Sequence, residues 1–216
     1  MKGSEKLPAT PLGRAQRPDL GYERIPKPRD ISRRSLAAAQ KFLWPRVWLL
    51  AGFEADLEAP GDYATCEVGR ESVVAVRQAD GDIRAYHNVC RHRGAQLIGT
   101  RCTRRSITCP YHAWNYGLDG RLRRRMHFAG PGIIETFDGG CNPKLDLVPA
   151  RVETWNGCVF VDISGRAAPL DEWLSPLAKR TQGYDFSAIR WAGRIDFDVK
   201  ANCCLLYTSP SPRDRG

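Results

Sequence analysis

The sequence has few histidines, few methionines and no long apolar run. Only 4 of its 216 residues are histidine and 2 are methionine. The longest unbroken run of apolar or glycine residues covers positions 47–53, which is far too short to cross a membrane. Residues 1–16 lack the apolar core of a signal peptide. The lack of a long apolar run argues against a membrane protein, and together with the lack of a signal peptide it predicts a cytoplasmic protein.

Acidic residues are outnumbered by basic ones, 24 against 33, which gives a formal charge of +9. Most of the basic residues are arginines, whose guanidinium groups keep their charge in any environment and pair with carboxylates. This balance is compatible with an acidic partner. No nucleic-acid-binding motif is present, and aromatic residues do not interleave with the arginines, so nucleic acid is not the predicted partner.

The middle of the chain, residues 46–164, is predicted to fold as a small antiparallel β domain, which makes the fold class mainly β. Short β-type runs alternate with turn signals, and the pairs Asp80-Gly81 and Asn156-Gly157 are typical of hairpins. Positions 123–127 are expected to lie in a loop. The expected strands cover residues 47–53, 63–68, 72–77, 83–88, 106–109, 113–116, 151–155 and 158–163.

The segments that flank this domain differ from it in composition. Residues 1–34 are rich in proline and charge, which predicts a disordered or extended arm. Residues 35–45 predict a short helix that Pro45 ends. Residues 165–202 predict a linker and the first strand of a further α+β domain. Within them we expect a helix over 169–182 and a strand over 193–202.

The last residues of the chain do not resemble a natural protein segment. Residues 204–214, CLLYTSPSPRD, resemble one reading frame of a common transposon-type sequencing adapter. In that frame the last base of the Cys203 codon also belongs to the adapter, so the natural residue there is expected to be tryptophan. The alternative is a flexible tail rich in serine and proline. We therefore expect residues 203–216 to be foreign and the chain to be a fragment.

One group of metal-binding residue types stands out, namely Cys90 and His92 followed by Cys109 and His112. Thiolates and imidazoles two or three residues apart are typical of metal ligands. Each pair begins where an expected strand ends, so two loops can close on one centre. The order differs from that of a zinc finger and matches a two-iron, two-sulfur cluster with both cysteines on one iron and both histidines on the other. A structural zinc site is the alternative, and Cys102 is expected to be a spectator.

Residues 90–122 resemble the Rieske cluster-binding motif of the aromatic-ring-hydroxylating oxygenase α-subunits. Beyond the four ligands, the run Arg93-Gly94-Ala95, the segment CPYHAW and a later Asp-Gly turn fit that pattern. The common form of the motif has glycine where this chain has Ala113, a change between small residues. The resemblance covers roughly residues 35–202, and it is specific at the motif and loose elsewhere.

The resemblance implies the electron-accepting Rieske domain of a mono- or dioxygenase large subunit. In that family a reductase or ferredoxin delivers the electrons, which pass to a mononuclear iron(II) whose ligands follow residue 202. This chain alone is therefore expected not to hydroxylate. The full-length parent is expected to be a homotrimer or an α/β hetero-oligomer. The implied [2Fe-2S] ligands are Cys90, His92, Cys109 and His112, and the residues around them are Arg93, Gly94, Tyr111 and Trp114.

The resemblance also separates this chain from other Rieske proteins. Respiratory-chain members carry an extra cysteine in each loop and join the two by a disulfide, where this chain has Ala95 and Tyr111. That difference implies a midpoint potential near the low end of the class, about −150 mV. A free-standing Rieske ferredoxin is another alternative. It would end near Ile163, and the flanking helices and further strand favour the oxygenase subunit instead.

Arginines gather around the motif in the sequence, at positions 91, 93, 101, 104, 105, 121, 123, 124 and 125. One interpretation is that they dock an acidic reductase or ferredoxin, with Arg91, Arg104, Arg105 and Arg124 as the candidate contacts. The other interpretation is a solvated basic surface without a partner.

Overall fold

The computed structural model describes residues 32–68, 70–99, 102–103, 105–138, 140–184 and 186. Within that part of the chain the α-helices are α2 (Arg33–Phe42) and α3 (Leu170–Arg180), and the 3-10 helices are η1 (Trp44–Arg46) and η2 (Glu54–Asp56). The strands are β1 (Leu49–Phe53), β2 (Asp62–Val68), β3 (Glu71–Arg77), β4 (Ile83–His87), β5 (Cys102–Thr103), β6 (Ile107–Thr108), β7 (Asn115–Tyr116), β8 (Leu122–Met126), β9 (Ile134–Thr136), β10 (Pro149–Trp155) and β11 (Cys158–Asp162).

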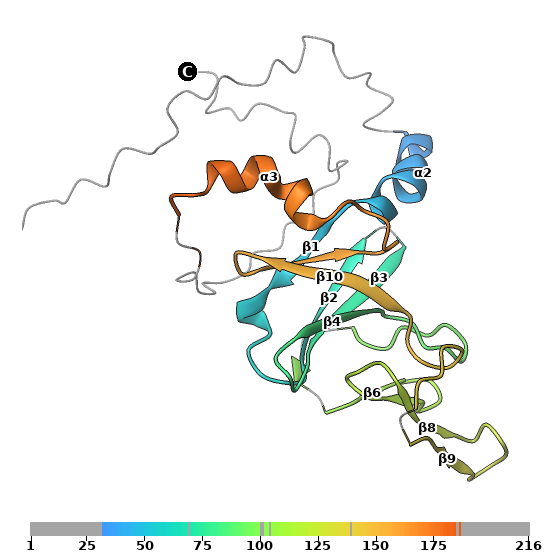
Figure 1. Cartoon of the computed structure of the whole chain (residues 1–216). Helices are drawn as coiled ribbons and strands as arrows, with labels where there is room; N and C mark the ends of the chain where they lie inside the picture. Colours follow the sequence, from blue (N-terminus) through green and yellow to red (C-terminus); the bar gives the residue numbers. More distant parts are fainter. Residues whose placement is uncertain are drawn as a thin grey trace, which may run out of the picture.

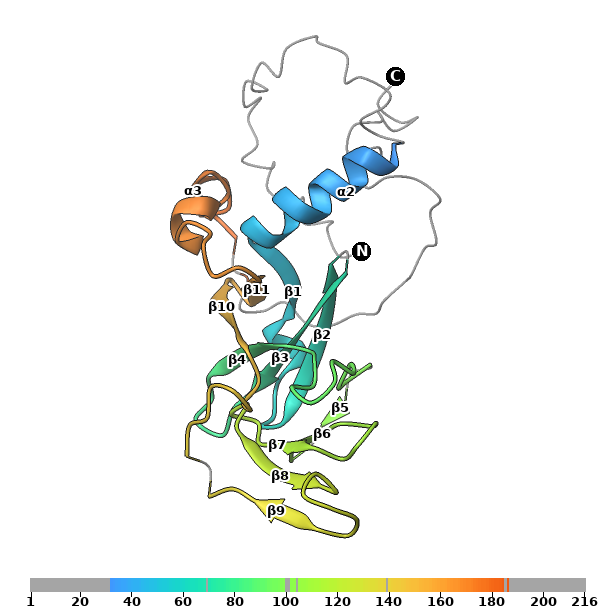
Figure 2. The same ribbon diagram turned by 90° about the vertical axis from the view of Figure 1, so that its right-hand side faces the viewer.

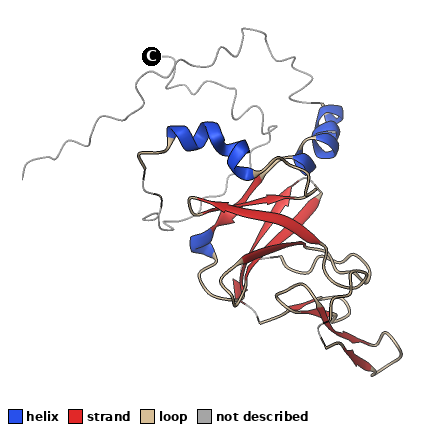
Figure 3. Ribbon diagram, viewed as in Figure 1, coloured by secondary structure: helices blue, strands red, loops and turns tan. Residues whose placement is uncertain are grey.

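The strands form two antiparallel sheets, which confirms the mainly β fold class. The large sheet has the order β1-β11-β10-β4-β3-β2-β5, and the small sheet has the order β6-β7-β8-β9. Helices α2 and α3 lie at one end of the molecule and the small sheet lies at the other (Figures 1 and 2). Figure 3 shows that the end with the small sheet consists mainly of loops and short strands. Among the described residues, no helix has the length and apolar character needed to span a bilayer.

Both predicted hairpin turns are present. Gly81 lies between β3 and β4 with a φ of +89°. Asn156 and Gly157 connect β10 and β11 with φ values of +48° and +76°. Two successive residues with positive φ are what a tight turn needs to match the twist of the strands, which is why Asn-Gly is favoured there.

Strand β3 lies at the centre of the structure and is buried on both faces. Val74 and Val76 face a core shared with the small sheet, whereas Val73 and Ala75 face a second core against β1 and β11. A strand covered on both sides is expected to be apolar throughout rather than alternating, as the run SVVAV is.

The prediction of a loop over residues 123–127 was wrong, because most of this segment belongs to β8. A β-bulge places one extra residue, Arg123, opposite the step from Asn115 to Tyr116. The bulge shifts the alternation of the strand, so Arg124 pairs with Asn115 while Leu122 pairs with Tyr116. A sequence pattern read with a strict period of two therefore misses this strand.

Helix α2 begins two residues before the predicted position because Ser32 caps it. The Ser32 hydroxyl accepts a hydrogen bond from the Ser35 N–H at 3.1 Å. Pro45 lies in the following 3-10 turn, as expected of a residue that ends a helix. The predicted arm up to residue 31, the predicted strand at 193–202 and the adapter-like tail lie outside the described residues.

A buried carboxylate holds the segment that leads from β11 to α3. Asp162 is completely buried and accepts hydrogen bonds from the Ser164 N–H, the Ser164 hydroxyl and the Ala167 N–H, at 3.0, 3.1 and 2.9 Å. Near this loop the indole N–H of Trp48 donates to the Ala168 carbonyl at 2.8 Å. These bonds fix the start of α3 on the sheet.

We predict that Asp162→Ala lowers the free energy of unfolding by about 2 kcal/mol, because it leaves two half-buried N–H groups without an acceptor. Urea denaturation followed by circular dichroism is the measurement. Asp82→Ala is the control, since Asp82 is exposed, and its effect should stay within about 0.5 kcal/mol. Equal effects of the two substitutions would contradict the role given to Asp162.

Candidate metal centre

The four candidate ligands lie on two loops that are built alike. One loop follows β4 and carries Cys90 and His92, and the other connects β6 to β7 and carries Cys109 and His112. In each loop the cysteine N–H donates to the carbonyl five residues later, at 2.8 Å. In each loop the cysteine carbonyl accepts from the N–H four residues later, at 3.0 and 3.1 Å. Two equivalent turns therefore present a thiol and an imidazole each.

The turn requires a left-handed residue four positions after the cysteine. Gly94 occupies this position in the first loop with a φ of +73°. In the second loop Ala113 occupies it with a φ of +55°. Glycine adopts this conformation freely, whereas a residue with a Cβ is strained there. The alanine is therefore a real departure from the common motif.

The two loops bring their cysteine side chains into one core and their histidine rings close to each other. Cys90 and Cys109 are both buried in the core that the two sheets share. The His92 and His112 rings approach each other with centroids 4.7 Å apart, at an angle of 66°. Among the described residues, no three His, Cys, Asp or Glu side chains surround a point that one metal ion could occupy. What the loops form is a pair of thiols beside a pair of imidazoles.

His92 is prepared to act as a neutral ligand. Its ring stacks on the buried Trp114 ring at 4.9 Å, with only 2° between the planes. Its Nδ1 is buried and has no hydrogen-bond partner among the described residues. Desolvation lowers the pKa of His92, and the nearby His112 and Arg93 lower it further. A neutral imidazole with a free, buried nitrogen fits metal coordination, which would satisfy an atom that is otherwise costly to bury.

The cysteine end contains a residue that the sequence analysis missed. Tyr116 is completely buried, and its hydroxyl lies 3.4 Å from the Cys90 sulfur. The same hydroxyl oxygen accepts a hydrogen bond from the Arg91 N–H at 3.1 Å. Burial raises the pKa of the Cys90 thiol, and the hydrogen bond with Tyr116 opposes this rise. In sequence Tyr116 is only an apolar-type strand residue, and its role depends on the fold.

Asn88 is a second residue whose position gave no signal in the sequence. Its buried side chain donates to the Ile98 carbonyl at 2.6 Å and accepts from the Ile98 N–H at 3.0 Å. It also donates to the Ser72 hydroxyl at 3.0 Å. One side chain thus fixes both ends of the first ligand loop to the large sheet.

The other predicted residues around the ligands differ in placement. Trp114 is buried against His92, whereas Tyr111 is 62% exposed with its ring centroid 3.8 Å from that of His112. Gly94 forms the turn described above, and Arg93 is exposed. Phe128, which the sequence did not single out, places its ring 6.0 Å from the His92 ring.

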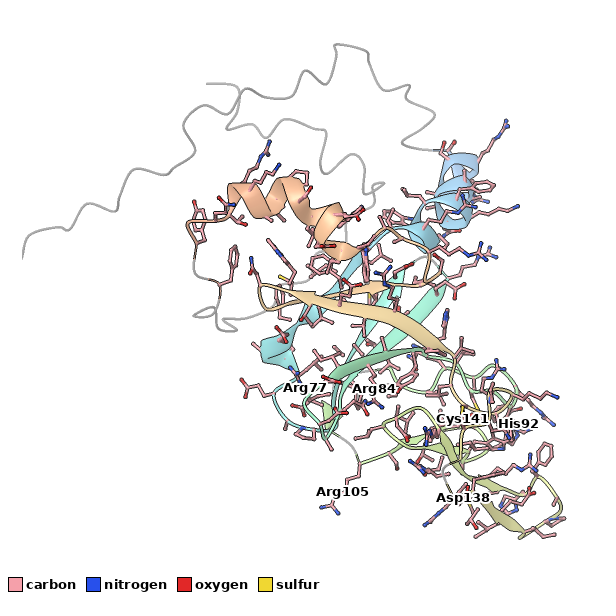
Figure 4. All side chains as sticks on the ribbon, in the orientation of Figure 1. Arg77, Arg84, His92, Arg105, Asp138 and Cys141 are labelled. Atoms are coloured by element: carbon pink, nitrogen blue, oxygen red, sulfur yellow. The ribbon has the colours of Figure 1, made fainter. Side chains whose placement is uncertain are left out.

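The candidate docking arginines that the structure describes are all exposed, and they lie on different segments. Arg91 is exposed and donates to the Lys144 carbonyl at 3.4 Å. Arg105 is exposed and lies well away from His92 (Figure 4). Arg124 is exposed on β8, and Arg104 lies outside the described residues. Several of the other arginines near the motif are ion-paired, Arg121 and Arg123 with Asp119, and Arg125 with Glu135.

The arrangement agrees with comparisons to known proteins. Residues 47–137 match the family model described as the Rieske [2Fe-2S] domain. The chain is 31% identical over 183 residues to the glycine betaine monooxygenase oxygenase subunit of Pseudomonas aeruginosa, a match that covers 84% of this chain and 41% of that protein. It is 36% identical over 139 residues to the carnitine monooxygenase oxygenase subunit of Escherichia coli, which covers 64% of this chain and 36% of that protein.

Solved structures of Rieske oxygenases are also similar to this chain. The quaternary ammonium Rieske monooxygenase CntA superposes with a TM-score of 0.60 at 31% identity, over 70% of this chain and 40% of CntA. Naphthalene 1,2-dioxygenase superposes with a TM-score of 0.58 at 32% identity, over 67% of this chain and 32% of that chain. The chain therefore spans less than half the length of the relatives that it matches.

The matching family implies a [2Fe-2S] cluster, and the residues present fit one. Two buried thiols lie together, two imidazoles lie together, and the buried Nδ1 of His92 lacks a hydrogen bond among the described residues. Thiolate and neutral imidazole are the ligands that such a cluster takes.

We predict that Ala113→Gly raises the free energy of unfolding by roughly 0.5–1 kcal/mol, because it removes the strain of a left-handed alanine. The reciprocal variant Gly94→Ala should lower it by about 1 kcal/mol. Space is not the reason, since a Cβ at Gly94 would meet nothing closer than 3.9 Å. Urea denaturation of both variants checks the pair. A loss of stability in Ala113→Gly would contradict the equivalence of the two turns.

We predict that Tyr116→Phe lowers the midpoint potential of the loaded chain by about 50 mV. In the loaded chain Cys90 would be a thiolate without a hydrogen of its own, so the Tyr116 hydroxyl, 3.4 Å from the sulfur, would be the donor of this hydrogen bond. A hydrogen bond to a thiolate ligand stabilises the more negative, reduced state, so its loss favours the oxidised state. Protein-film voltammetry gives the value. Tyr86→Phe is the matched control, because Tyr86 is a buried tyrosine on β4 of the same core, and an equal shift there would refute the assignment.

Proposed function

Residues 47–137 are a Rieske [2Fe-2S] domain, and from this premise we propose that the chain accepts single electrons from a partner protein and relays them within an oxygenase large subunit. The observation that carries the proposal is the separation of the ligands into a buried thiol pair and an imidazole pair. Cys90 and Cys109 would hold one iron, and His92 and His112 the other. The cluster, when bound, supplies the ability to take up and release one electron.

The chain's own residues prepare this site in three ways. Trp114 stacks on the His92 ring and keeps water from its inner side. Desolvation lowers the pKa of His92, which favours the neutral imidazole that binds metal. Asn88 and the two paired turns hold the loops to the sheet, so the ligands are positioned before any metal arrives.

The parent protein is proposed to be a mono- or dioxygenase with a second, mononuclear iron site. Its relatives include monooxygenase subunits for glycine betaine and carnitine and the large component of a naphthalene dioxygenase. A 2-His-1-carboxylate iron site needs two further histidines. Of the remaining histidines, His87 faces Glu71 at 3.9 Å and His127 accepts the Gly132 N–H at 2.8 Å. We therefore expect the chain alone to accept electrons without hydroxylating a substrate.

The proposed partners of the parent are a reductase or ferredoxin as electron donor and further subunits in a homotrimer or α/β assembly. Support for the assembly comes from a related structure that was described as revealing inter-subunit electron transfer. A cluster held by loops at the end of the domain, away from α2 and α3, can approach a neighbouring subunit (Figure 2).

We predict that replacing Cys90 or Cys109 by Ser, or His92 or His112 by Ala, abolishes a stable cluster. Each residue supplies one of the four protein ligands, and a cluster missing one of them loses both a bond and its charge balance. Iron content and the visible spectrum after reconstitution are the measurements.

Cys141→Ser is the matched control, because Cys141 is an exposed cysteine, and it should keep the red-brown colour and two irons per chain. A colourless protein that binds one zinc per chain would contradict the proposal. That result would indicate the zinc-stabilised binding module instead.

A further inference from the structure

The outer face of the small sheet is hollowed into a groove of about 700 Å³. Its floor is a row of residues that pair across the four strands, from Thr108 through Asn115 and Arg124 to Thr136. Ala113, the residue that follows His112, also lines the groove. A molecule bound here would therefore lie one peptide bond from a proposed cluster ligand.

The groove presents hydrogen-bond donors in excess. The Asn115 side chain donates one N–H to the Ser106 hydroxyl and the other to the Thr108 hydroxyl, both at 2.8 Å. Each hydroxyl oxygen is thus used as an acceptor, and each O–H is left to donate into the groove. Among the described residues that line the groove, none is acidic. Such a set of donors suits a carboxylate.

Arg123 and Arg124 both line the groove, and Arg124 supplies its unpaired positive charge. It is exposed, and no carboxylate among the described residues pairs with it. Its two neighbours are different, since Arg123 pairs with Asp119 at 2.8 Å and Arg125 pairs with Glu135 at 2.6 Å. The guanidinium of Arg124 is therefore available to a partner, whereas its neighbours are neutralised within the fold.

We propose that this groove is the docking site for carboxylate side chains of an acidic electron-donor protein, with Arg124 as the central contact. The proposal rests on the proposed function, because it places the donor beside the His112 loop. The step is a transfer of one electron: the donor is oxidised, the cluster of this chain is reduced, and no atom is exchanged. The charge complementarity of an unpaired arginine and an acidic donor would steer the encounter.

The test is the rate at which the full chain, loaded with its cluster, is reduced by an acidic plant-type [2Fe-2S] ferredoxin. Such a ferredoxin has a potential well below that of Rieske clusters, so the transfer is downhill. Arg124→Glu should lower the second-order rate constant roughly tenfold at low ionic strength, and the difference should shrink as salt is added. Stopped-flow spectroscopy measures both.

Arg180→Glu is the matched control. It makes the same change in charge on α3, at the end of the molecule opposite the small sheet (Figure 1). It should leave the rate nearly unchanged. Equal slowing by both variants, or slowing by neither, would overturn the proposal. Photoreduced deazaflavin, an uncharged donor, should reduce all three proteins equally. If it fails to reduce the wild type, the proposed function itself is wrong.

A second measurement does not depend on the cluster. Added hexaglutamate peptide should shift the nuclear magnetic resonance signals of the Asn115 side-chain amide in the wild type and not in Arg124→Glu. Because Asn115 bonds both groove hydroxyls, a carboxylate bound to them must change its environment. Shifts confined to other parts of the chain would overturn the assignment of the groove.

Discussion

The site depends on one backbone constraint, a turn of six residues that occurs twice, at 90–95 and at 109–114. In each turn the cysteine N–H and carbonyl are both used, so the cysteine backbone is fixed before its side chain binds anything. The turn has a conformational cost, because the residue four positions after the cysteine must adopt a left-handed backbone conformation. Gly94 meets this demand without strain and Ala113 does not. The second loop therefore stores strain next to His112, and the packing of Trp114 and Tyr116 around it must hold that conformation.

The large sheet supplies the rigidity that these turns need. Val74 and Val76 of β3 belong to the same core as the two cysteines and Trp114, so the loops rest on a strand that is buried on both faces. Hydrogen bonds also hold the loops in place. Asn88 binds Ser72 of β3 at the start of the first loop, and Tyr116, which follows the second loop, accepts a hydrogen bond from the first loop. A metal site built on such a base has its geometry set by the protein, which limits the reorganisation when an electron arrives.

Much of the fold and of the ligand site could be predicted from the sequence, because the strongest sequence signals are local. The hairpin turns, the apolar β3 and the spacing of the cysteines and histidines all depend on neighbours within a few residues. Arginine-rich β8 could not be found, since Arg125 is paired with Glu135 on another strand, β9, and the alternation of β8 is shifted by the bulge at Arg123. Tyr116 and Asn88 were missed because a hydrogen bond to a loop 25 or 10 residues away leaves no periodic pattern.

The same bulge decides what the arginines of β8 can do. After it, Arg125 points to the side of Trp114, where its guanidinium lies 4.0 Å from the Phe128 ring and is neutralised by Glu135. Arg124 points to the opposite side and lines the groove. An unpaired cation on the inner side would pull on the electron held by the histidine end, whereas one on the outer side acts on an approaching partner. By shifting the strand by one residue, the bulge places Arg125 against Glu135 on the side of Trp114 and leaves Arg124 exposed in the groove that we propose for a donor.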